Sequence, residues 1–479
     1  MRGGWFFFCW ALLFCLVPAG AVRAQWVVAE SPHFRLHQRG APQEAVAQVR
    51  QLEEFHAFLV SLTGGAHGTG PSSKLDLFVV DRLDEALPGA GLSPGIRGFY
   101  RSTPGGIAVF ARADSMGRSA GSQAVLLHEY AHHFLVGDRA HAYPAWYVEG
   151  FAEYFGTARF SARRIEYGRV DRARLAWLLK GAWLPPEDVL RWRGEARGPG
   201  PTSMLYAQSW LMTHWLLRTP GGPERLTAYL VAVTKGADPV AAFTAHVDPD
   251  LDTLNLRLRD YFESPRWANF TRVPRAGPLE VEVAVTALPP SADRLLLPKV
   301  AILQGVAREE GSRLLAEIRA GADLSDPFAA RALSLAEARH GDPAVALELL
   351  TGLLEQSPAD ADLLRWRGEA RLRADGNPLA ARADFRAAFT AEPTDWRAMV
   401  AYVRTFPPAG LDAERLALLE RGWELAPQVK DTGLMLAQAL LLNGRGREAA
   451  RIVQPILFSP HGLFRPPAGV WIALPDQAR

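Results

Sequence analysis

Cysteine is almost absent from this chain of 479 residues: there are two, Cys9 and Cys15, both near the start. An excess of one charge is also missing, because 53 basic side chains are balanced by 51 acidic ones. After residue 24, no stretch approaches the roughly 18 apolar residues of a membrane-spanning helix. These absences argue against a disulfide-stapled fold, against nucleic acid or a polybasic membrane patch, and against a membrane span after the first 24 residues.

The first 24 residues have the three parts of a secretory signal. Arg2 precedes an apolar stretch from Trp5 to Val17, and Val22-Arg23-Ala24 offers tolerated residues at the −3 and −1 positions. Cleavage there would remove both cysteines, and Phe14 before Cys15 argues against a lipid anchor. We therefore expect an exported protein, periplasmic or extracellular, with an uncleaved signal anchor as the alternative.

Histidine is scarce as well, with 12 in the chain, yet two lie four positions apart in His128-Glu129-Tyr130-Ala131-His132. On a helix these two histidines share one face, so both imidazoles can bind one zinc ion, and Glu129 reaches the open coordination position. A serine at 119 and a glycine at 137 can begin and end a helix of about five turns around the motif. The pentapeptide predicts a metal site and a general base.

A second helix is predicted between Pro144 and Gly156, with Glu149 and Glu153 on one face. A catalytic zinc ion has three protein ligands and keeps one position open for water. Since the first helix supplies two histidines, we expect the third ligand to be a carboxylate of the second helix.

This pairing resembles the gluzincin metallopeptidases, the clan of thermolysin-like and aminopeptidase-N-like enzymes, and more narrowly the peptidase MA-like proteins with tetratricopeptide repeats. Val148-Glu149-Gly150-Phe151-Ala152 is similar to their Asn-Glu-Gly-Phe-Ala segment. The resemblance implies that Glu149 is the third zinc ligand and that Glu153 orients a ligand histidine from the second shell of the site. The segment between the two motifs is slightly shorter than is often found in these families, so the reverse assignment of Glu149 and Glu153 stays open.

Three other residues compete as ligands. Asp138 occupies the last position of the metzincin pattern, but Leu135 stands where that pattern requires a glycine. His133 points a third of a turn away from its neighbour and His141 lies in a polar loop, so both are expected to be ordinary surface or packing histidines. The alternative for the whole cluster is a structural or vestigial site.

The expected chemistry is hydrolysis of a peptide bond by a zinc-activated water, with Glu129 as the general base that then protonates the leaving amine. The resemblance implies a second donor to the oxyanion, and Tyr206 lies in a Tyr-Ala-Gln-Ser segment similar to that of the family. A tyrosine on an apolar helix face is usually a core residue, which remains the alternative, and His214 is the weaker substitute.

The predicted fold class is α+β. Strands are expected at 32–37 and 75–80, a helix at 42–62, and a hairpin at 97–101 and 106–112. In the families that the chain resembles, the strand before the zinc helix pairs with the extended substrate. The predicted order is a signal peptide at 1–24, a zincin-like peptidase domain at 25–263 with a small sheet and helices, a linker at 264–298 with a short strand, and an all-α tetratricopeptide-like solenoid at 299–479.

The solenoid is predicted from prolines that recur every 33 to 35 residues, the period of tetratricopeptide helix pairs: Pro358, Pro393, Pro427 and Pro460. One unit also carries the small, aromatic, small and proline positions of the repeat at Gly368, Ala381, Phe385, Ala388 and Pro393. The concave face of such a solenoid binds extended peptides or protein partners. Generic helical packing is the alternative.

Two functions of different class follow. The first is an exported zinc metallopeptidase whose repeats dock a peptide or protein substrate or a partner. The second is a repeat-based envelope adaptor with a catalytically inactive zincin-like domain. Because repeats contact mainly their neighbours, we also expect the chain to fold as two independent parts joined at 264–298.

Overall fold

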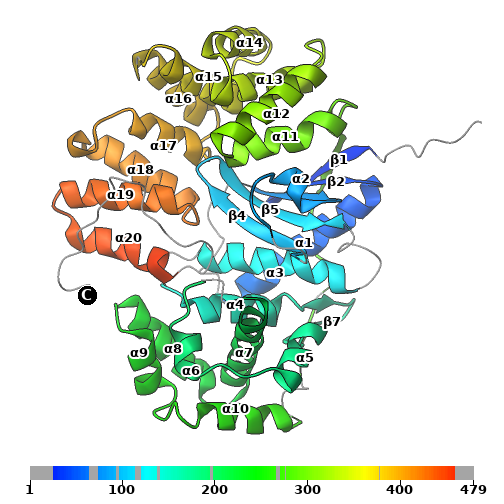
Figure 1. Cartoon of the computed structure of the whole chain (residues 1–479), viewed down its shortest axis with the longest axis vertical. Coiled ribbons are helices and arrows are strands. Elements are labelled where there is room, and N and C mark those ends of the chain that lie inside the picture. The colour runs from blue at the N-terminus through cyan, green and yellow to red at the C-terminus, as the bar shows by residue number, and fades with distance from the viewer. Residues whose placement is uncertain are drawn as a thin grey trace, which may run out of the picture.

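The computed structural model describes residues 25–63, 74–92, 96–113, 120–137, 141–194, 198–265, 270–275, 277–376 and 378–458. Within these ranges the chain is a mixed α/β structure, mostly helical, with a six-stranded and a three-stranded sheet (Figure 1). The expected signal segment, Asp138 and Pro460 lie outside the described residues. None of the described helices is long and apolar enough to cross a membrane.

The strands are β1 Trp26–Glu30, β2 Phe34–Arg39, β3 Leu75–Val80, β4 Gly98–Thr103, β5 Gly106–Arg112, β6 Arg159–Phe160, β7 Arg164–Tyr167, β8 Thr271–Pro274 and β9 Ala284–Ala287. The helices before the predicted linker are α1 Pro42–Leu62, α2 Leu83–Ala86, α3 Ala120–Val136, α4 Ala145–Phe155, α5 Arg172–Lys180, α6 Pro186–Leu190, α7 Pro199–Arg218, α8 Gly222–Thr234, α9 Pro239–His246 and α10 Leu254–Glu263. Those that follow are α11 Ala292–Gln304, α12 Arg308–Gly321, α13 Pro327–His340, α14 Pro343–Gln356, α15 Ala361–Ala374, α16 Pro378–Ala391, α17 Trp396–Arg404, η2 Pro408–Gly410, α18 Ala413–Leu425, α19 Lys430–Leu442 and α20 Gly446–Phe458.

The larger sheet has the strand order β4-β5-β3-β2-β1-β9, so β4 forms one edge. Strands β2, β3 and β5 are parallel, while β4, β1 and β9 pair antiparallel with their neighbours. Side chains of β2 alternate, with Phe34 and Leu36 fully buried and Arg35 and His37 partly exposed. Helices α1 and α3 cover one face of the sheet, and α2 and α11 pack on the other.

Helix α4 lies between α3 and α7, and every one of its residues is buried. Eight of its eleven residues are apolar or aromatic, and they lie all round the helix, which is the pattern of a helix enclosed by the protein. Its two carboxylates, Glu149 and Glu153, are therefore also buried. Since a buried charge is costly without partners, these two residues must find cations or donors nearby.

Several predicted elements have the bounds that the sequence indicates. Helix α1 at 42–62 and strand β3 at 75–80 match residue for residue, and α3 and α4 begin and end within about a residue of the predicted positions. Strand β1 was missed by the sequence reading. Its residues Trp26 to Ala29 are all buried, so the alternation that marks a half-buried strand is absent there.

The stretch 264–298 differs from the predicted linker. It contains β8, which pairs with β7, and β9, which extends the larger sheet beside β1, and α11 already begins at Ala292. The short strand expected at 279–285 is observed at 284–287. Nothing in the sequence near β9 indicates that it pairs with a strand more than 250 residues earlier. For this reason the sequence predicts a linker here.

Helices α11 to α20 stack in sequence and form an arc above and beside the sheet (Figure 1). Pro358, Pro393 and Pro427 lie just beyond the ends of α14, α16 and α18. The arc starts with α11 on the sheet and returns to it at α19, which contacts β4. Its last helix, α20, contacts α8 instead, where Gln454 donates from Nε2 to the backbone oxygen of Val233 at 3.3 Å.

The two predicted parts share one hydrophobic core. The same buried cluster that contains Val27 and Phe262 also contains Phe385, Trp396 and Val453. The expectation of two independently folded parts does not fit this arrangement. The hairpin between β4 and β5 also meets the inner side of the arc, since a side-chain carbon at Gly105 would overlap the backbone of Leu303.

Candidate metal centre

Helix α3 positions three of the predicted site residues. Its buried side, which faces α1 and the sheet, carries Leu126, Leu127, Tyr130 and Phe134. The histidines at 128 and 132 are one helical turn apart on the other side, toward α4. The apolar spacing that fixes the rotation of α3 therefore also aims both imidazoles at α4.

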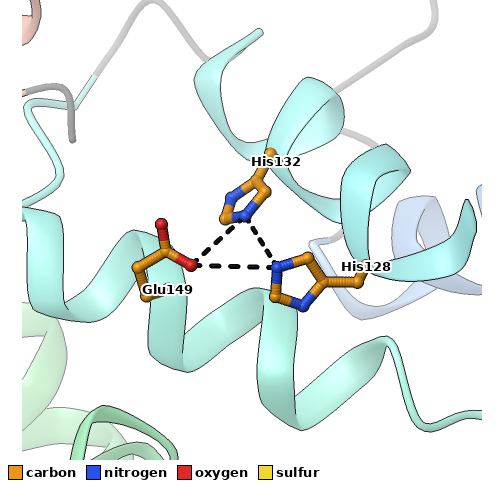
Figure 2. A group of neighbouring side chains, drawn as sticks. All are labelled: His128, His132 and Glu149. Atoms are coloured by element: carbon orange, nitrogen blue, oxygen red, sulfur yellow. Dashed lines mark hydrogen bonds and ion pairs between the residues drawn. The ribbon is translucent and has the colours of Figure 1, made fainter. Parts of the chain in front are cut away.

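Three donor atoms from α3 and α4 meet at one point (Figure 2). The Nε2 atoms of His128 and His132 are 3.0 Å apart, and Glu149 Oε2 lies 3.8 Å from the first and 3.4 Å from the second. Bonds of about 2.0–2.2 Å at the tetrahedral angle separate the ligand atoms of zinc by roughly 3.3–3.6 Å. The measured separations lie within a few tenths of an ångström of this range, on either side of it, so the two imidazoles and one carboxylate can hold a single zinc-sized cation after small side-chain shifts.

The cluster is enclosed on one side and accessible on the other. Side chains of His132 and Glu149 are 1% and 2% exposed, whereas that of His128 is 22% exposed. Burial, reinforced by the neighbouring His132, lowers the pKa of His128 to about 4, and burial lowers the pKa of His132 to about 3. Both imidazoles are therefore neutral at pH 7, which is the form that binds a metal ion.

Glu129 lies beside this cluster with a raised proton affinity. Its side chain is 8% exposed, and its carboxylate accepts a hydrogen bond from the backbone N–H of Tyr100 on β4. Burial, and then the charge of Glu149, raise the pKa of Glu129 to about 8. Without a cation beside it, Glu129 is therefore mostly protonated at pH 7, and the positive charge of a metal ion held by its neighbours would lower this pKa toward the range of a general base.

Glu153 has a different set of neighbours, and one of them was missed by the sequence reading. Its Oε1 accepts hydrogen bonds from Arg174 Nε at 2.9 Å and Nη2 at 2.7 Å, and lies 3.9 Å from His128 Nδ1. Arg174 is in the first turn of α5, which begins where the Asp171 side chain accepts from the Ala173 N–H. No sequence signal links Arg174 to the motif, because α5 reaches it only through the fold.

Tyr206 of α7 also belongs to this neighbourhood. Its ring lies 4.8 Å from the guanidinium carbon of Arg174. The charge of Glu149, together with burial, raises the pKa of the Tyr206 hydroxyl well above its usual value, so this hydroxyl stays protonated. His214, by contrast, is fully buried in the core, with its Nδ1 2.7 Å from the Tyr261 hydroxyl.

The other candidate ligands lie elsewhere or outside the described residues. His133 Nδ1 is 3.2 Å from the Tyr100 hydroxyl and faces β4. The ring of His141 lies 5.7 Å from that of Tyr143, in the segment before α4. Asp138 is among the residues that the structure does not describe.

A comparison with protein families gives one match. Residues 122–237 match a family model described as a protein of unknown function, DUF1570. This match covers less than half of the chain, but it spans α3, α4, α5 and α7 and so includes every residue of the candidate centre. No curated protein matches the chain.

Proposed function

We propose that the protein is a zinc-dependent metallopeptidase of the gluzincin type. The observation that carries the proposal is the convergence of His128, His132 and Glu149 on one point, with Glu129 beside them. Three protein donors leave one position of a tetrahedral ion open, which is typical of catalytic zinc. A structural site would be expected to supply four.

Zinc held by these residues would polarise the substrate carbonyl and lower the pKa of a bound water to about 7. Glu129 takes the proton of the attacking water on its carboxylate and then passes it to the leaving amine. Tyr206 keeps its hydroxyl proton and can donate it in a hydrogen bond to the developing oxyanion.

Glu153 and Arg174 lie next to the proposed ligands and orient them. Arg174 holds the Glu153 carboxylate with two hydrogen bonds, and that carboxylate lies near His128 Nδ1. A carboxylate in this position favours the tautomer in which Nε2 is available to the ion. The same guanidinium lies against the Tyr206 ring, so Arg174 orients residues on both sides of the centre.

For the chain as a whole, we propose export, followed by action on peptides or proteins outside the cytoplasm. The support is the signal-like segment at 1–24. We further propose that helices α11 to α20 are tetratricopeptide-like repeats that assist recognition of the substrate or of a protein partner. Their support is the 33 to 35 residue spacing of the prolines.

The deciding experiment tests whether Glu129 is needed for peptidase activity but not for zinc binding or folding. Glu129→Gln keeps the shape and a hydrogen-bond acceptor but removes the base. We expect about one zinc per chain, a free energy of unfolding within about 1 kcal/mol of wild type, and peptidase activity reduced by at least about 10²-fold. Zinc is measured by atomic absorption, and activity by mass spectrometry of a mixed peptide library.

Glu355→Gln is the matched control, since Glu355 is an exposed carboxylate on α14. It should leave both zinc content and activity unchanged. A wild-type protein that holds zinc yet cleaves nothing in the library would favour the adaptor function. A Glu129→Gln protein as active as wild type would remove Glu129 from the mechanism.

A further inference from the structure

The edge strand β4 passes directly beside the candidate centre. Strand β4 contacts α3, the helix that carries Glu129 and both histidines, and the Tyr100 hydroxyl lies 3.2 Å from His133 Nδ1 on that helix. The backbone of Tyr100 is also close enough to Glu129 to act on its carboxylate. Outward and inward positions alternate in an antiparallel pair, and the Arg97 carbonyl accepts from the Arg112 N–H on the inward side. Gly98, Tyr100 and Ser102 therefore present their backbone groups at the edge of the sheet.

Such an edge can pair with an extended peptide. The proposed function requires the reacting bond to lie next to Glu129, and hence next to Tyr100. The length of edge on either side of Tyr100 then limits how many substrate residues can pair on that side.

The edge is closed two residues beyond Tyr100 by the loop between α18 and α19. Ser102 Oγ donates to the backbone oxygen of Gln428 in this loop at 2.9 Å. The Gln428 side chain donates from Nε2 to the backbone oxygen of His133 at 3.3 Å, so it joins the loop to the last turn of α3. Gln428 is only 7% exposed, and α19 itself contacts β4.

A second contact holds the arc against the same end of β4. Arg101 donates from Nη2 to the backbone oxygen of Gly305 at 2.9 Å, beyond the end of α11. Arg101 points to the face of the sheet that α11 covers, opposite α3, so this contact fixes β4 to the arc from the other side, while the space between β4 and α3 is bounded at the Ser102 end by the α18–α19 loop. Figure 1 shows α19 beside the sheet at this edge.

We propose that the α18–α19 loop closes the amino-terminal side of the substrate groove, so that the enzyme cleaves peptides after their first or second residue. This inference rests on the proposed peptidase function. Antiparallel pairing is the more stable arrangement per residue, and it places the amino-terminal half of a substrate toward Ser102. Two strand residues span roughly 7 Å, which is room for about two substrate residues before the loop.

The test is a ladder of peptides with one scissile bond and one, two, four or six residues before it, cleaved by zinc-loaded full-length protein. We expect kcat/KM to fall by at least about 10-fold between two and four residues, which corresponds to about 1.4 kcal/mol. A matched ladder extended after the scissile bond should show no such step. Mass spectrometry of the products verifies that the same bond is cut throughout.

Equal cleavage of all members of the first ladder would overturn the inference and leave the peptidase function standing. Cleavage of no peptide in either ladder would reject the peptidase function, and this inference with it. The two failures are therefore distinct.

A variant pair tests whether the loop is the cause. Ser102→Ala combined with Gln428→Ala removes both side-chain hydrogen bonds that hold the loop. We expect cleavage of the six-residue peptide to rise relative to that of the two-residue peptide by about 3-fold or more, which is the scale of one net hydrogen bond. Gln454→Ala is the control, because Gln454 makes the same kind of bond to Val233 at 3.3 Å away from β4. An unchanged ladder in the double variant, with thermal unfolding like that of wild type, would contradict the role of the loop.

Discussion

Glu149 and Glu153 lie one turn apart on α4, yet they have different partners. Glu149 Oε2 is within 4 Å of both histidine Nε2 atoms, whereas Glu153 is held by Arg174 and lies near His128 Nδ1. The sequence alone left open which of the two is the ligand. The geometry favours Glu149, because only its carboxylate lies on the side of the imidazoles where the two Nε2 atoms meet.

Replacing these carboxylates one at a time should separate their roles. Glu149→Gln should lose most of the zinc, since it removes a ligand oxygen that bears charge. Glu153→Gln should retain zinc but with affinity lower by about 10–100-fold, the usual effect of losing a partner behind a ligand histidine. Zinc affinity is measured by competition with a chelator of known affinity. A Glu153→Gln protein that is empty while Glu149→Gln stays loaded would reverse the assignment.

The buried His56 gives the fold a pH dependence of its own. It is 8% exposed, and its Nδ1 lies 2.6 Å from the Tyr130 hydroxyl. Its ring centroid is 4.0 Å from that of His33, which in turn pairs with Glu53. Burial, and then the charge of His33, lower the pKa of His56 to about 4. In the unfolded chain the pKa of histidine is about 6.5.

As the pH falls below about 6.5, His56 therefore becomes protonated in the unfolded chain, whereas in the folded protein it stays neutral until about pH 4. The full stability is present above this window, and on the order of 3 kcal/mol is lost across it. His56→Gln removes the titration while keeping a partner for Tyr130, so its stability should fall less between pH 7 and pH 4.5. Urea unfolding at both pH values measures the difference, and equal losses in the two proteins would exclude His56 as the cause.

At the scale of elements, the position of α4 depends on a glycine. A side-chain carbon at Gly150 would overlap Thr213 Oγ1 and the backbone oxygen of Ser209 on α7. The close contact of α4 with α7 therefore requires glycine at this position, and it sets the depth at which the neighbouring Glu149 is held. The segment Val148 to Ala152 thus contributes to the packing of α4 as well as to the proposed metal site.

Gly150→Ala should weaken both the fold and the metal site. Overpacking of this kind typically costs about 1–3 kcal/mol, and moving α4 away from α7 displaces Glu149 from the two imidazoles. Gly352→Ala is the control: Gly352 lies on α14 with no atom within 4 Å of an added carbon, and the change should stabilise by about 0.4–1 kcal/mol. Thermal unfolding and zinc affinity are measured for both. Unchanged zinc affinity in Gly150→Ala would show that α4 does not set the ligand geometry.

At the scale of the whole molecule, the arc and the sheet stabilise each other. Strand β9 completes the sheet, α11 covers one face of it, and the core that contains Val27 continues to Val453. A chain cut near residue 263 would expose the surfaces that these elements cover. Large exposed apolar surfaces lead to aggregation.

We therefore expect the fragment 25–263 to be insoluble or to unfold without cooperativity, and to recover when residues 264–458 are expressed with it. Solubility, near-ultraviolet circular dichroism and calorimetry measure the outcome. A soluble fragment that melts cooperatively by itself would show that the sheet does not need β9 and α11. The fragment 25–291, which restores β9 alone, shows how much of any recovery is due to that strand.

The sequence by itself determined the local features of this protein. The helix period places His128 and His132 on one face, apolar spacing gives α1 and β3 their bounds, and the recurring prolines lie just beyond the ends of α14, α16 and α18. Each of these depends on residues within a few turns or one strand of each other. Such short-range patterns can be recognised directly in the amino-acid sequence.

Only the tertiary structure decided which distant segments meet. Arg174 reaches Glu153 from another helix, β9 pairs with β1 across more than 250 residues, and Gln428 reaches Ser102 from the far end of the arc. These contacts form because the apolar faces of sheet, helices and arc can be buried together in one way, and their charged and polar groups then find partners where that packing brings them. The sequence pattern at each segment is compatible with many partners, so the choice belongs to the packing of the whole chain.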